Sequence, residues 1–464
     1  MADLETDYLV VGAGVSGMGF VDAMAPRAGD VDAIIVDTRH SPGGHWNDAY
    51  PFVRLHQPAA VFGADSMRLG DDRIDEHGPN AGFYQLATAP EVVAYYGRLR
   101  DALEAGGNVR FMGATQYCGT DGDEHVLRSV VSGKTMTVSV RRRLVDTSYA
   151  EPTIPSRHTP SFGVDADARV VPPNALVDLA EVPSGFTVLG AGKTSMDACG
   201  WLLAQGVDPD AIRWVRPRDV WMMRRASTQP LKLVGSGFMK LQAEWVKAAA
   251  LATDAPDLAR RLEAGDVFAR LDTSIEPEMF RGATVSDGEI EALRHIGDVV
   301  RMGRVLHVGA SGLKLEQGEL PTAPGHLYVD CTASGVRDVE TRPVFEPGRI
   351  TMQLVTLGNV PYSAATVGAV EALVDDDDTR NAMCAPLGGF GTPDRVVGAA
   401  RVFLNSTPQR MFHPAVGEWN ETTRLNSARV LPELADDPEV QAGQATMFEY
   451  LGPAMENLAR MTGG

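Results

Sequence analysis

Cysteine and long hydrophobic runs are scarce in this sequence of 464 residues. No two of its cysteines stand two residues apart, so the chain lacks a Cys-x-x-Cys pair that could serve as a redox dithiol. We expect reduced, mostly buried thiols in a cytoplasmic protein at Cys118, Cys199, Cys331 and Cys384. The longest apolar helix that we expect, residues 246–252, is too short to cross a bilayer, so no membrane span is predicted.

Positive charge is also in deficit, with 42 Lys and Arg against 61 Asp and Glu and a formal net charge of −19. Such a surface repels a phosphate backbone, which argues against a nucleic-acid partner. Too few residues precede the first apolar run at 7–11 for a secretion signal. The histidines show no metal-ligand spacing and no Gly-x-Ser-x-Gly string occurs, so we expect neither a metal site nor a hydrolase.

A dinucleotide-binding pattern is present near the N-terminus. The apolar run at residues 8–11 predicts a buried parallel strand, and residues 18–24 predict the helix that follows it. Between them stand the glycines that a tight turn, a close pyrophosphate and helix packing require, namely Gly12, Gly14 and Gly17. A second strand over residues 33–36 ends in Asp37, whose carboxylate can accept ribose hydroxyls; capping a turn is its alternative role.

A further glycine turn follows this carboxylate, with a large aromatic close behind it: Gly44, His45 and Trp46. Here, and in the stretch Tyr-Pro-Phe-Val-Arg-Leu-His-Gln-Pro at 50–58, the chain resembles the two-dinucleotide-binding-domain flavoproteins, especially the flavin-containing and Baeyer–Villiger monooxygenases. The resemblance implies FAD at the first site, with His56 and Gln57 beneath the isoalloxazine as candidate catalytic residues. Their structural alternative is a hydrogen-bonded pair in a loop, and that of Trp46 is a half-buried surface aromatic.

The dinucleotide-binding pattern occurs a second time. Residues 186–189 predict a strand, residues 196–205 a helix and residues 212–215 the next strand, with the turn at Gly190, Gly192 and Ser195. At the end of that strand, where an NAD-binding protein carries an acid, the chain has Arg216, Pro and Arg218. A guanidinium pairs well with a 2′-phosphate, so NADPH is favoured over NADH, with Arg216 as the foremost candidate; the alternative is that some of these arginines form surface ion pairs.

These motifs predict an α/β protein with two Rossmann-like units. Similar strands ending in Asp at 144–148 and 328–332 mark crossings between the units in the resembled families. We therefore expect a discontinuous FAD domain (1–155 and 326–464, including a C-terminal tail) around an NADPH domain (156–325). A helical insertion is predicted over 228–300, with helices at 238–250, 258–264 and 290–296, as a place for substrate contacts or a homodimer surface.

The C-terminal part predicts a strand and turn over residues 353–358 and then a helix over 361–374. In related folds this helix points its N-terminus, here Pro361 and Tyr362, at the pyrimidine edge of the flavin, where its partial positive charge stabilises the reduced form. The small residues that follow would equally suit close helix packing. Both interpretations stay open from the sequence.

Together these patterns predict an NADPH-dependent FAD oxidoreductase, in which the cofactors perform the hydride transfer. The resemblance implies a monooxygenase that uses molecular oxygen, through a peroxyflavin, on a small organic substrate. The chain departs from the Baeyer–Villiger pattern because it lacks the Phe-x-Gly-x-x-x-His string. A dehydrogenase or reductase that passes electrons to an organic acceptor, and a redox-sensing protein that uses its cofactors structurally, are the alternatives.

Overall fold

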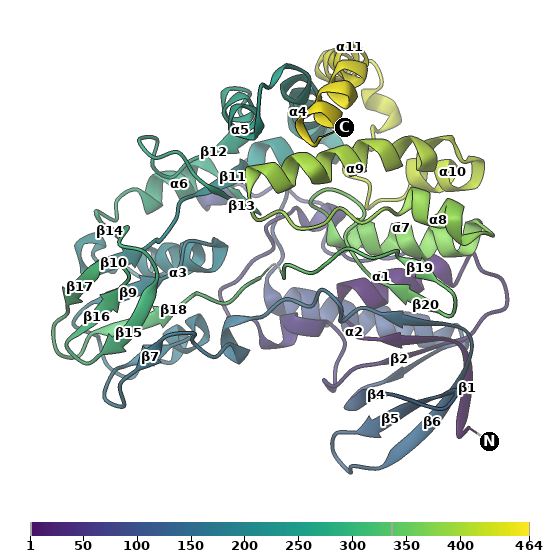
Figure 1. Cartoon of the computed structure of the whole chain (residues 1–464), viewed down its shortest axis with the longest axis horizontal. Coiled ribbons are helices and arrows are strands. Elements are labelled where there is room, and N and C mark those ends of the chain that lie inside the picture. The colour runs from purple at the N-terminus through teal and green to yellow at the C-terminus, as the bar shows by residue number, and fades with distance from the viewer. Residues whose placement is uncertain (1, 336, 464) are drawn as a thin grey trace.

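The computed structural model describes residues 2–335 and 337–463 and shows two lobes built on parallel sheets, with a helical lobe above them (Figure 1). The predicted α/β class with two Rossmann-like sheets is confirmed. Three strands coincide with the predicted ranges, because short apolar runs bounded by turns leave little freedom for their ends: β2 (Ala33–Val36), β9 (Phe186–Leu189) and β10 (Ile212–Val215).

The first sheet has the order β19-β20-β6-β1-β2-β3, in which β1 pairs in parallel with both β2 and β6. Two further strands, β4 and β5, continue from β6 in antiparallel pairing. Besides β2, its strands are β1 (Leu4–Val11), β3 (Val109–Met112), β4 (Thr115–Asp121), β5 (Glu124–Ser129), β6 (Thr135–Asp146), β19 (Phe345–Glu346) and β20 (Arg349–Thr351).

Alternate side chains of β1 enter two different cores. Val10 packs with three helices on one face, α1 (Val15–Met24), α2 (Ala89–Ala105) and α7 (Val360–Leu373), whereas Leu9 packs with the β4 and β5 side of the sheet. Both faces of β1 are therefore buried, as expected for a continuous apolar run at the centre of a parallel sheet.

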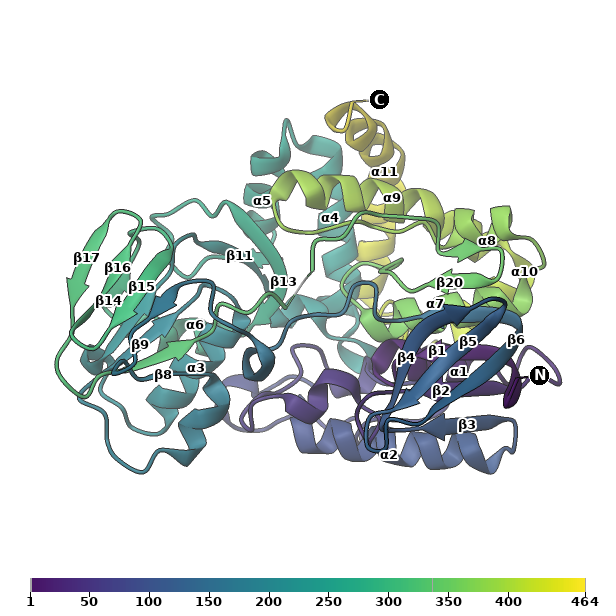
Figure 2. The ribbon, with the colours of Figure 1, turned by 60° about the horizontal axis from the view of Figure 1, so that its bottom comes forward.

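The second sheet repeats this plan with the order β14-β10-β9-β18-β8. Val188 of β9 faces the core beneath α3 (Lys193–Ala204), and Leu189 faces a small four-stranded sheet. The remaining strands are β8 (Val170–Val171), β14 (Asp298–Val300) and β18 (Leu327–Asp330), and in the small sheet β7 (Gly163–Val164), β15 (Val305–Gly309), β16 (Gly312–Leu315) and β17 (Gly318–Pro321). Figure 2 shows β4–β6 at one end of the molecule and β15–β17 at the other.

The sequence predicts a helical insertion over residues 228–300, but the structure shows both helices and strands in this region. The region contributes α4 (Lys240–Leu251), α5 (Ala255–Ala264) and α6 (Asp287–Leu293), but also β12 (Phe268–Ala269), β13 (Met279–Val285) and β14. These strands form because β13 and β12 flank β11 (Val220–Arg224), and β14 completes the second sheet beside β10. The helices predicted at 238–250, 258–264 and 290–296 overlap α4, α5 and α6, whereas the strands of this region were not predicted.

The strand predicted over residues 353–358 is also wrong, although the turn ends there, at Gly358 with φ +70°. The strand of this region is β20, which pairs with β6 through Thr351 and Asp146. The partner strand ends at Asp146, so the chain beyond Met352 has no ladder to join and turns toward α7. Because β18 pairs with β9, the chain returns to the first sheet after Asp330, beyond the predicted boundary at 325.

The helical lobe joins two distant parts of the chain. Its core combines α4 and α5 with two C-terminal helices, α9 (Pro393–Phe412) and α11 (Pro438–Met461). Two shorter helices, α8 (Asp377–Met383) and α10 (Pro414–Thr422), pack between this lobe and the first sheet. Within the described residues, no helix is both long and apolar enough to span a membrane.

Candidate functional site

The first glycine turn lies between β1 and α1. Gly12 has φ +104°, and a Cβ there would lie 2.3 Å from Thr147 Oγ1; a Cβ at Gly17 would lie 2.0 Å from the Gly12 carbonyl oxygen. No larger residue fits either position without displacing backbone or its neighbour. Gly12 and Gly17 are therefore required by the turn itself.

Gly14 begins α1, and no side chain in the described part of the chain caps this helix end. Gly44, with φ +56°, lies against it, since a Cβ on Gly44 would be only 2.9 Å from Gly14 Cα. The first glycine turn and the turn at Gly44 thus meet beside the partial positive charge of the N-terminus of α1, which suits a pyrophosphate. This cradle fits the adenine dinucleotide part of FAD.

Asp37 ends β2 and is buried. Its Oδ2 accepts a hydrogen bond from the N–H of Ala13 at 2.9 Å, and its Oδ1 accepts one from the N–H of Arg39 at 2.8 Å. Asp37 therefore fastens the glycine turn to the end of β2. Each carboxylate oxygen has a second lone pair, so the group can still accept a ribose hydroxyl.

His45 and Trp46 lie on a 3-10 helix, Gly44–Asp48 (η1), with their rings stacked at 5.6 Å between centroids. Burial, and then the charge of Arg39, lower the pKa of His45 to about 4, so its imidazole is neutral at pH 7. Trp46 is half-buried and contacts Phe62 edge to face. These contacts fix η1 beside Gly14 whether or not a cofactor is bound.

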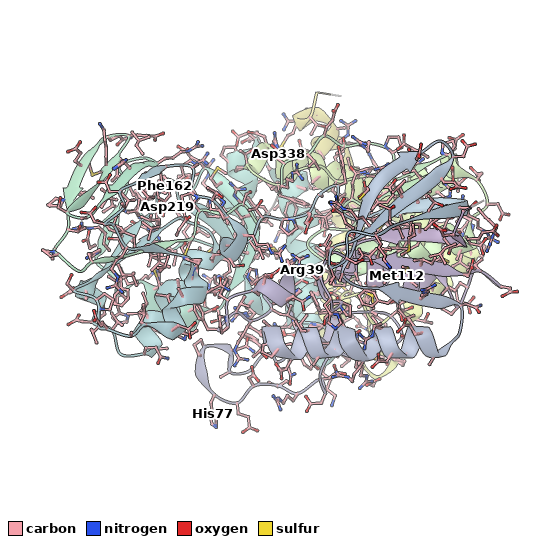
Figure 3. The ribbon with its side chains drawn as sticks, turned by 90° about the horizontal axis from the view of Figure 1, so that it is seen from below. Arg39, His77, Met112, Phe162, Asp219 and Asp338 are labelled. Atoms are coloured by element: carbon pink, nitrogen blue, oxygen red, sulfur yellow. The ribbon has the colours of Figure 1, made fainter. Side chains whose placement is uncertain are left out.

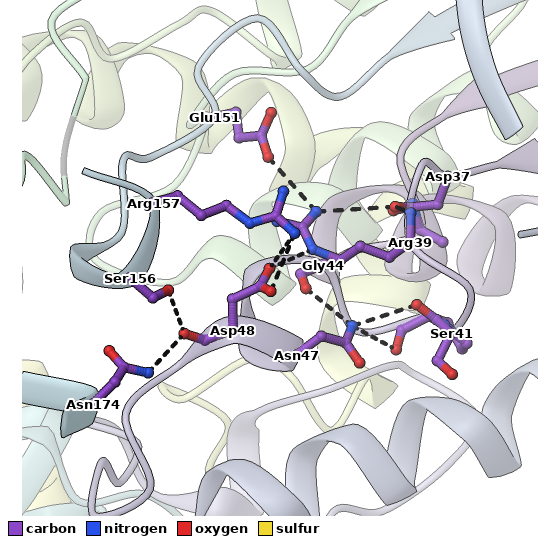
Figure 4. Close-up of polar contacts among 12 residues, drawn as sticks. Asp37, Arg39, Ser41, Gly44, Asn47, Asp48, Glu151, Ser156, Arg157 and Asn174 are labelled. Carbon is purple, nitrogen blue, oxygen red and sulfur yellow. Dashed lines mark hydrogen bonds and ion pairs between the residues drawn. The ribbon is translucent and has the colours of Figure 1, made fainter. Parts of the chain in front are cut away.

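Asp48, at the end of η1, was missed by the sequence analysis. Its carboxylate accepts Arg39 Nε at 2.7 Å and pairs with Arg157 at 3.1 Å, while its carbonyl accepts Ser156 Oγ at 2.7 Å and Asn174 Nδ2 at 3.2 Å (Figure 4). Arg157 and Ser156 belong to the connection between the two sheets, and Figure 3 shows Arg39 near the middle of the molecule. Asp48 thus ties the first glycine site to the connecting segment.

Gln57 joins the predicted flavin-side stretch to α7. Its Nε2 donates to the carbonyl of Gly358, and the next residue, Asn359, caps α7 by accepting the Tyr362 N–H at 3.1 Å. Gln57 and the start of α7, with Pro361, therefore lie together. The Tyr362 side chain instead points away, bonding to Asn420 and stacking on Trp419, so only its backbone faces this end of the helix.

His56 lies between the two lobes. Its carbonyl accepts Thr284 Oγ1 of β13 at 2.5 Å, which links the first lobe to the second. Burial, and then the positive charge of Lys193, lower the pKa of His56 to about 4. The imidazole is therefore neutral at pH 7, with one ring nitrogen that donates a hydrogen bond and one that accepts.

The second glycine turn has the same geometry as the first. Gly190 has φ +128°, and a Cβ there would lie 2.7 Å from the Cys331 carbonyl oxygen, whereas a Cβ at Gly192 meets no described atom within 4 Å. Ser195 replaces the third glycine and is buried, with its Oγ donating to the Gly192 carbonyl at 2.7 Å. No described side chain caps α3 at Gly192, so this end also fits a pyrophosphate.

Arg216 follows β10 as expected, but its guanidinium is buried inside the second lobe. It stacks over Trp214 at 4.8 Å and pairs with Asp219 at 3.0 Å, a residue that Figure 3 shows within that lobe. Arg218, two residues on, is exposed, and its charge contributes with burial to lowering the pKa of Arg281 on β13. Arg218 is therefore more accessible to an anion than the buried Arg216.

Trp221 of β11 is buried in the core of the helical lobe. Its ring is tilted against Phe268, which stacks on Phe280, and the cavity beside them has a volume of about 10 Å³. That volume is too small for an organic substrate. Among the residues described, no cluster of His, Cys, Asp or Glu could hold a metal ion.

This arrangement defines a class of protein: the fold is that of the flavin-containing and Baeyer–Villiger monooxygenases. An oxidized steroid monooxygenase bound to NADP is similar with a TM-score of 0.50, at 13% identity over 99% of each chain. The OTEMO complex with FAD and NADP gives a TM-score of 0.50 at 12% identity, over 79% of this chain and 84% of that one. The fold implied by the resemblance in the sequence is thereby confirmed.

Within this class, the chain belongs to the same family as a group of mycobacterial proteins. It is 37% identical to the uncharacterized protein Rv2000 of Mycobacterium tuberculosis (strain ATCC 25618 / H37Rv), over 99% of this chain and 84% of that protein. The uncharacterized protein Mb2023 of Mycobacterium bovis (strain ATCC BAA-935 / AF2122/97) matches with the same identity and coverage. No model of a protein family matches the sequence.

Proposed function

We propose that the protein is an NADPH-dependent FAD oxidoreductase of the monooxygenase type, which inserts one oxygen atom into a small organic substrate. The observation that carries the proposal is the pair of uncapped helix N-termini at Gly14 and Gly192, each preceded by a glycine turn at the end of a parallel sheet. Dinucleotides bind in such places because the turn admits the pyrophosphate and the helix end complements its charge.

The first lobe holds FAD in this proposal. Its pyrophosphate lies on the turns at Gly12, Gly14 and Gly44, with Gly17 packing α1 and the Asp37 carboxylate accepting the ribose. His45 and Trp46 brace η1, and the backbone of Pro361 and Tyr362 offers the start of α7 to the flavin ring.

The second lobe holds NADPH on Gly190, Gly192 and Ser195. Arg218 and Arg281 take the 2′-phosphate, because they are the guanidiniums whose charge at this strand end is not committed to Asp219. Arg216 supports them from behind by holding Asp219 and Trp214 in place.

When bound, FAD and NADPH supply the hydride transfer and the activation of molecular oxygen. The chain contributes a neutral imidazole at His56, which can hold or pass a proton, and Gln57, which fixes the loop against α7. Closure of this region by both lobes excludes water from the reacting centre.

The test is direct. The purified protein should be yellow, bleach on addition of NADPH, and then consume oxygen as the colour returns. A protein that neither carries nor takes up FAD contradicts the proposal. Bleaching that is reversed by an organic acceptor without oxygen consumption supports the dehydrogenase, and a yellow protein that NADPH does not bleach supports the redox sensor.

A further inference from the structure

A buried ion network lies directly behind the second glycine turn. Lys193, the first residue of α3, pairs with Asp197 one turn later and with Glu289 of α6 at 3.2 Å; Glu289 also pairs with Arg225 at 2.6 Å. The side chains of Lys193 and Arg225 are only 10% and 1% exposed. Two cations and two carboxylates thus balance within one enclosed space.

One member of the network comes from the other lobe. The Tyr50 hydroxyl, in the flavin-side stretch, donates to Asp197 Oδ2 at 2.7 Å. Burial, and then the charge of Asp197, raise the pKa of Tyr50 well above its usual value, so the hydroxyl remains a proton donor. Asp197 therefore holds a bond to each lobe, through Tyr50 on one side and Lys193 on the other.

The ion pairs keep Lys193 and Glu289 charged at neutral pH. Burial alone would lower the pKa of Lys193, but Asp197 and Glu289 raise it. Burial would likewise raise the pKa of Glu289, but Lys193 and Arg225 bring it down to about 2. Moving the lobes apart would break the Tyr50–Asp197 hydrogen bond and leave the Asp197 carboxylate without that donor.

An apolar contact runs beside the polar one. Phe52 stacks on Trp201 of α3 with ring centroids 5.0 Å apart, and Tyr50 packs against Phe52. Stacking is tolerant of sliding, whereas a hydrogen bond to a fixed carboxylate specifies one position. The stack keeps the lobes in contact, and this hydrogen bond, together with that of Thr284 to the His56 carbonyl, restricts their relative placement.

We propose that Asp197 is a positioning residue, which couples the second glycine turn to the flavin-side stretch through Tyr50 and holds the two lobes at a single closed distance. This rests on the proposed function only in its consequence for hydride transfer. This Tyr50–Asp197 lock consists of the chain's own residues, so its effect on the distance between the lobes can be measured without nucleotide.

The first experiment measures the distance between the lobes. Cys118 is exposed on β4, the other three cysteines are buried, and Val182 is 95% exposed in the second lobe. Spin labels on Cys118 and on a Val182→Cys variant therefore report the separation of the lobes in the protein as purified. We expect one narrow distance distribution, which Tyr50→Phe and Asp197→Asn broaden.

The matched control is Tyr328→Phe. Tyr328 is also buried and its hydroxyl also makes a 2.7 Å hydrogen bond, to Thr322, but both residues lie in the second lobe. This variant should keep the narrow distribution. A distribution that stays narrow in both Tyr50→Phe and Asp197→Asn, or that broadens equally in the control, overturns the lock.

The second experiment separates this proposal from the proposed function. In Tyr50→Phe, the rate of bleaching at saturating NADPH should fall about tenfold, while the KM for NADPH changes less than twofold. An unchanged rate overturns the positioning role. If the parent protein itself is not bleached, the proposed function fails, whereas the distance measurement still decides whether Tyr50 and Asp197 lock the lobes.

Discussion

At the residue scale, the glycine turns of the two lobes are the part of the candidate cofactor sites that the sequence predicts best. Their spacing predicts the positions because a positive φ and the absence of a Cβ are local demands that only glycine meets. The interpretation of Arg216 depends on its surroundings, which the pattern could not supply. Asp219, three residues later, turns that arginine inward, and the signal for this ion pair was its i,i+3 spacing.

The two glycines of the second turn should respond differently to alanine. Gly190→Ala places a Cβ against the Cys331 carbonyl at a φ of +128° and should cost about 1–3 kcal/mol of stability. Gly192→Ala has room in the protein alone and should cost about 1 kcal/mol or less, but should weaken NADPH binding at least tenfold. Urea unfolding and NADPH titration of both variants check this pair, and equal stability losses would refute it.

Substitution of Arg218 or Arg281 should affect mainly the KM for NADPH, whereas substitution of Arg216 should affect mainly the stability of the fold. Arg218→Ala and Arg281→Ala should each raise the KM for NADPH about tenfold and leave the KM for NADH unchanged, because each loses one contact to the 2′-phosphate. Arg216→Ala should instead destabilise the fold, since it removes the buried partner of Asp219. Steady-state kinetics with both nucleotides, beside a thermal melt, distinguish these outcomes; a larger loss of NADPH preference in Arg216→Ala, without loss of stability, would reverse the assignment.

At the element scale, the strands that flank glycine turns follow from their apolar runs, and those elsewhere do not. The strand β13 includes Gly282 at φ +67°, and its pairing with β11 shifts register, so no regular alternation marks it in the sequence. The C-terminal helices are defined by long-range packing, α11 on α4 and α9 on α5, across more than 100 residues that local patterns do not encode. Long-range packing is therefore the part that sequence analysis missed.

The cap of α7 offers a test at this scale. Asn359→Ala should cost about 1 kcal/mol of stability and also weaken FAD retention, because it loosens the helix start beside Gln57. Asp254→Ala removes the similar cap of α5, where Asp254 accepts the Asp257 N–H at 2.8 Å far from the glycine turns. That control should lose similar stability and keep its flavin; equal flavin loss in both variants would count against a role for α7.

At the scale of the whole molecule, the free energy of unfolding should depend on pH, because several histidines are buried as neutral imidazoles in the folded state. The pKa of His56, His45 and His326 is lowered from 6.5 to about 4, first of all by burial. The unfolded chain therefore binds more protons between pH 6.5 and 4, so stability is complete above pH 6.5 and falls as the pH drops toward 4.

For His56, the full loss amounts to at most about 3 kcal/mol. Urea unfolding between pH 7.5 and 4.5 should show this decline, and His56→Gln should flatten it. A profile that stays level down to pH 5, or a variant with an undiminished slope, would contradict the burial of a neutral imidazole at this position.

The core of the helical lobe can be completed only after the C-terminal helix α11 has been translated. Ala454 and Leu458 of α11 complete the core around α4, and Asn457 donates to the Ala249 and Ala252 carbonyls at 2.8 Å. During translation, α4 leaves the ribosome before α11 has been synthesised. Its apolar face is therefore exposed in the nascent chain, and nascent chains with exposed apolar surface depend on chaperones. A polypeptide released before α11 is translated would keep that face exposed permanently and become a substrate for aggregation or quality-control proteolysis.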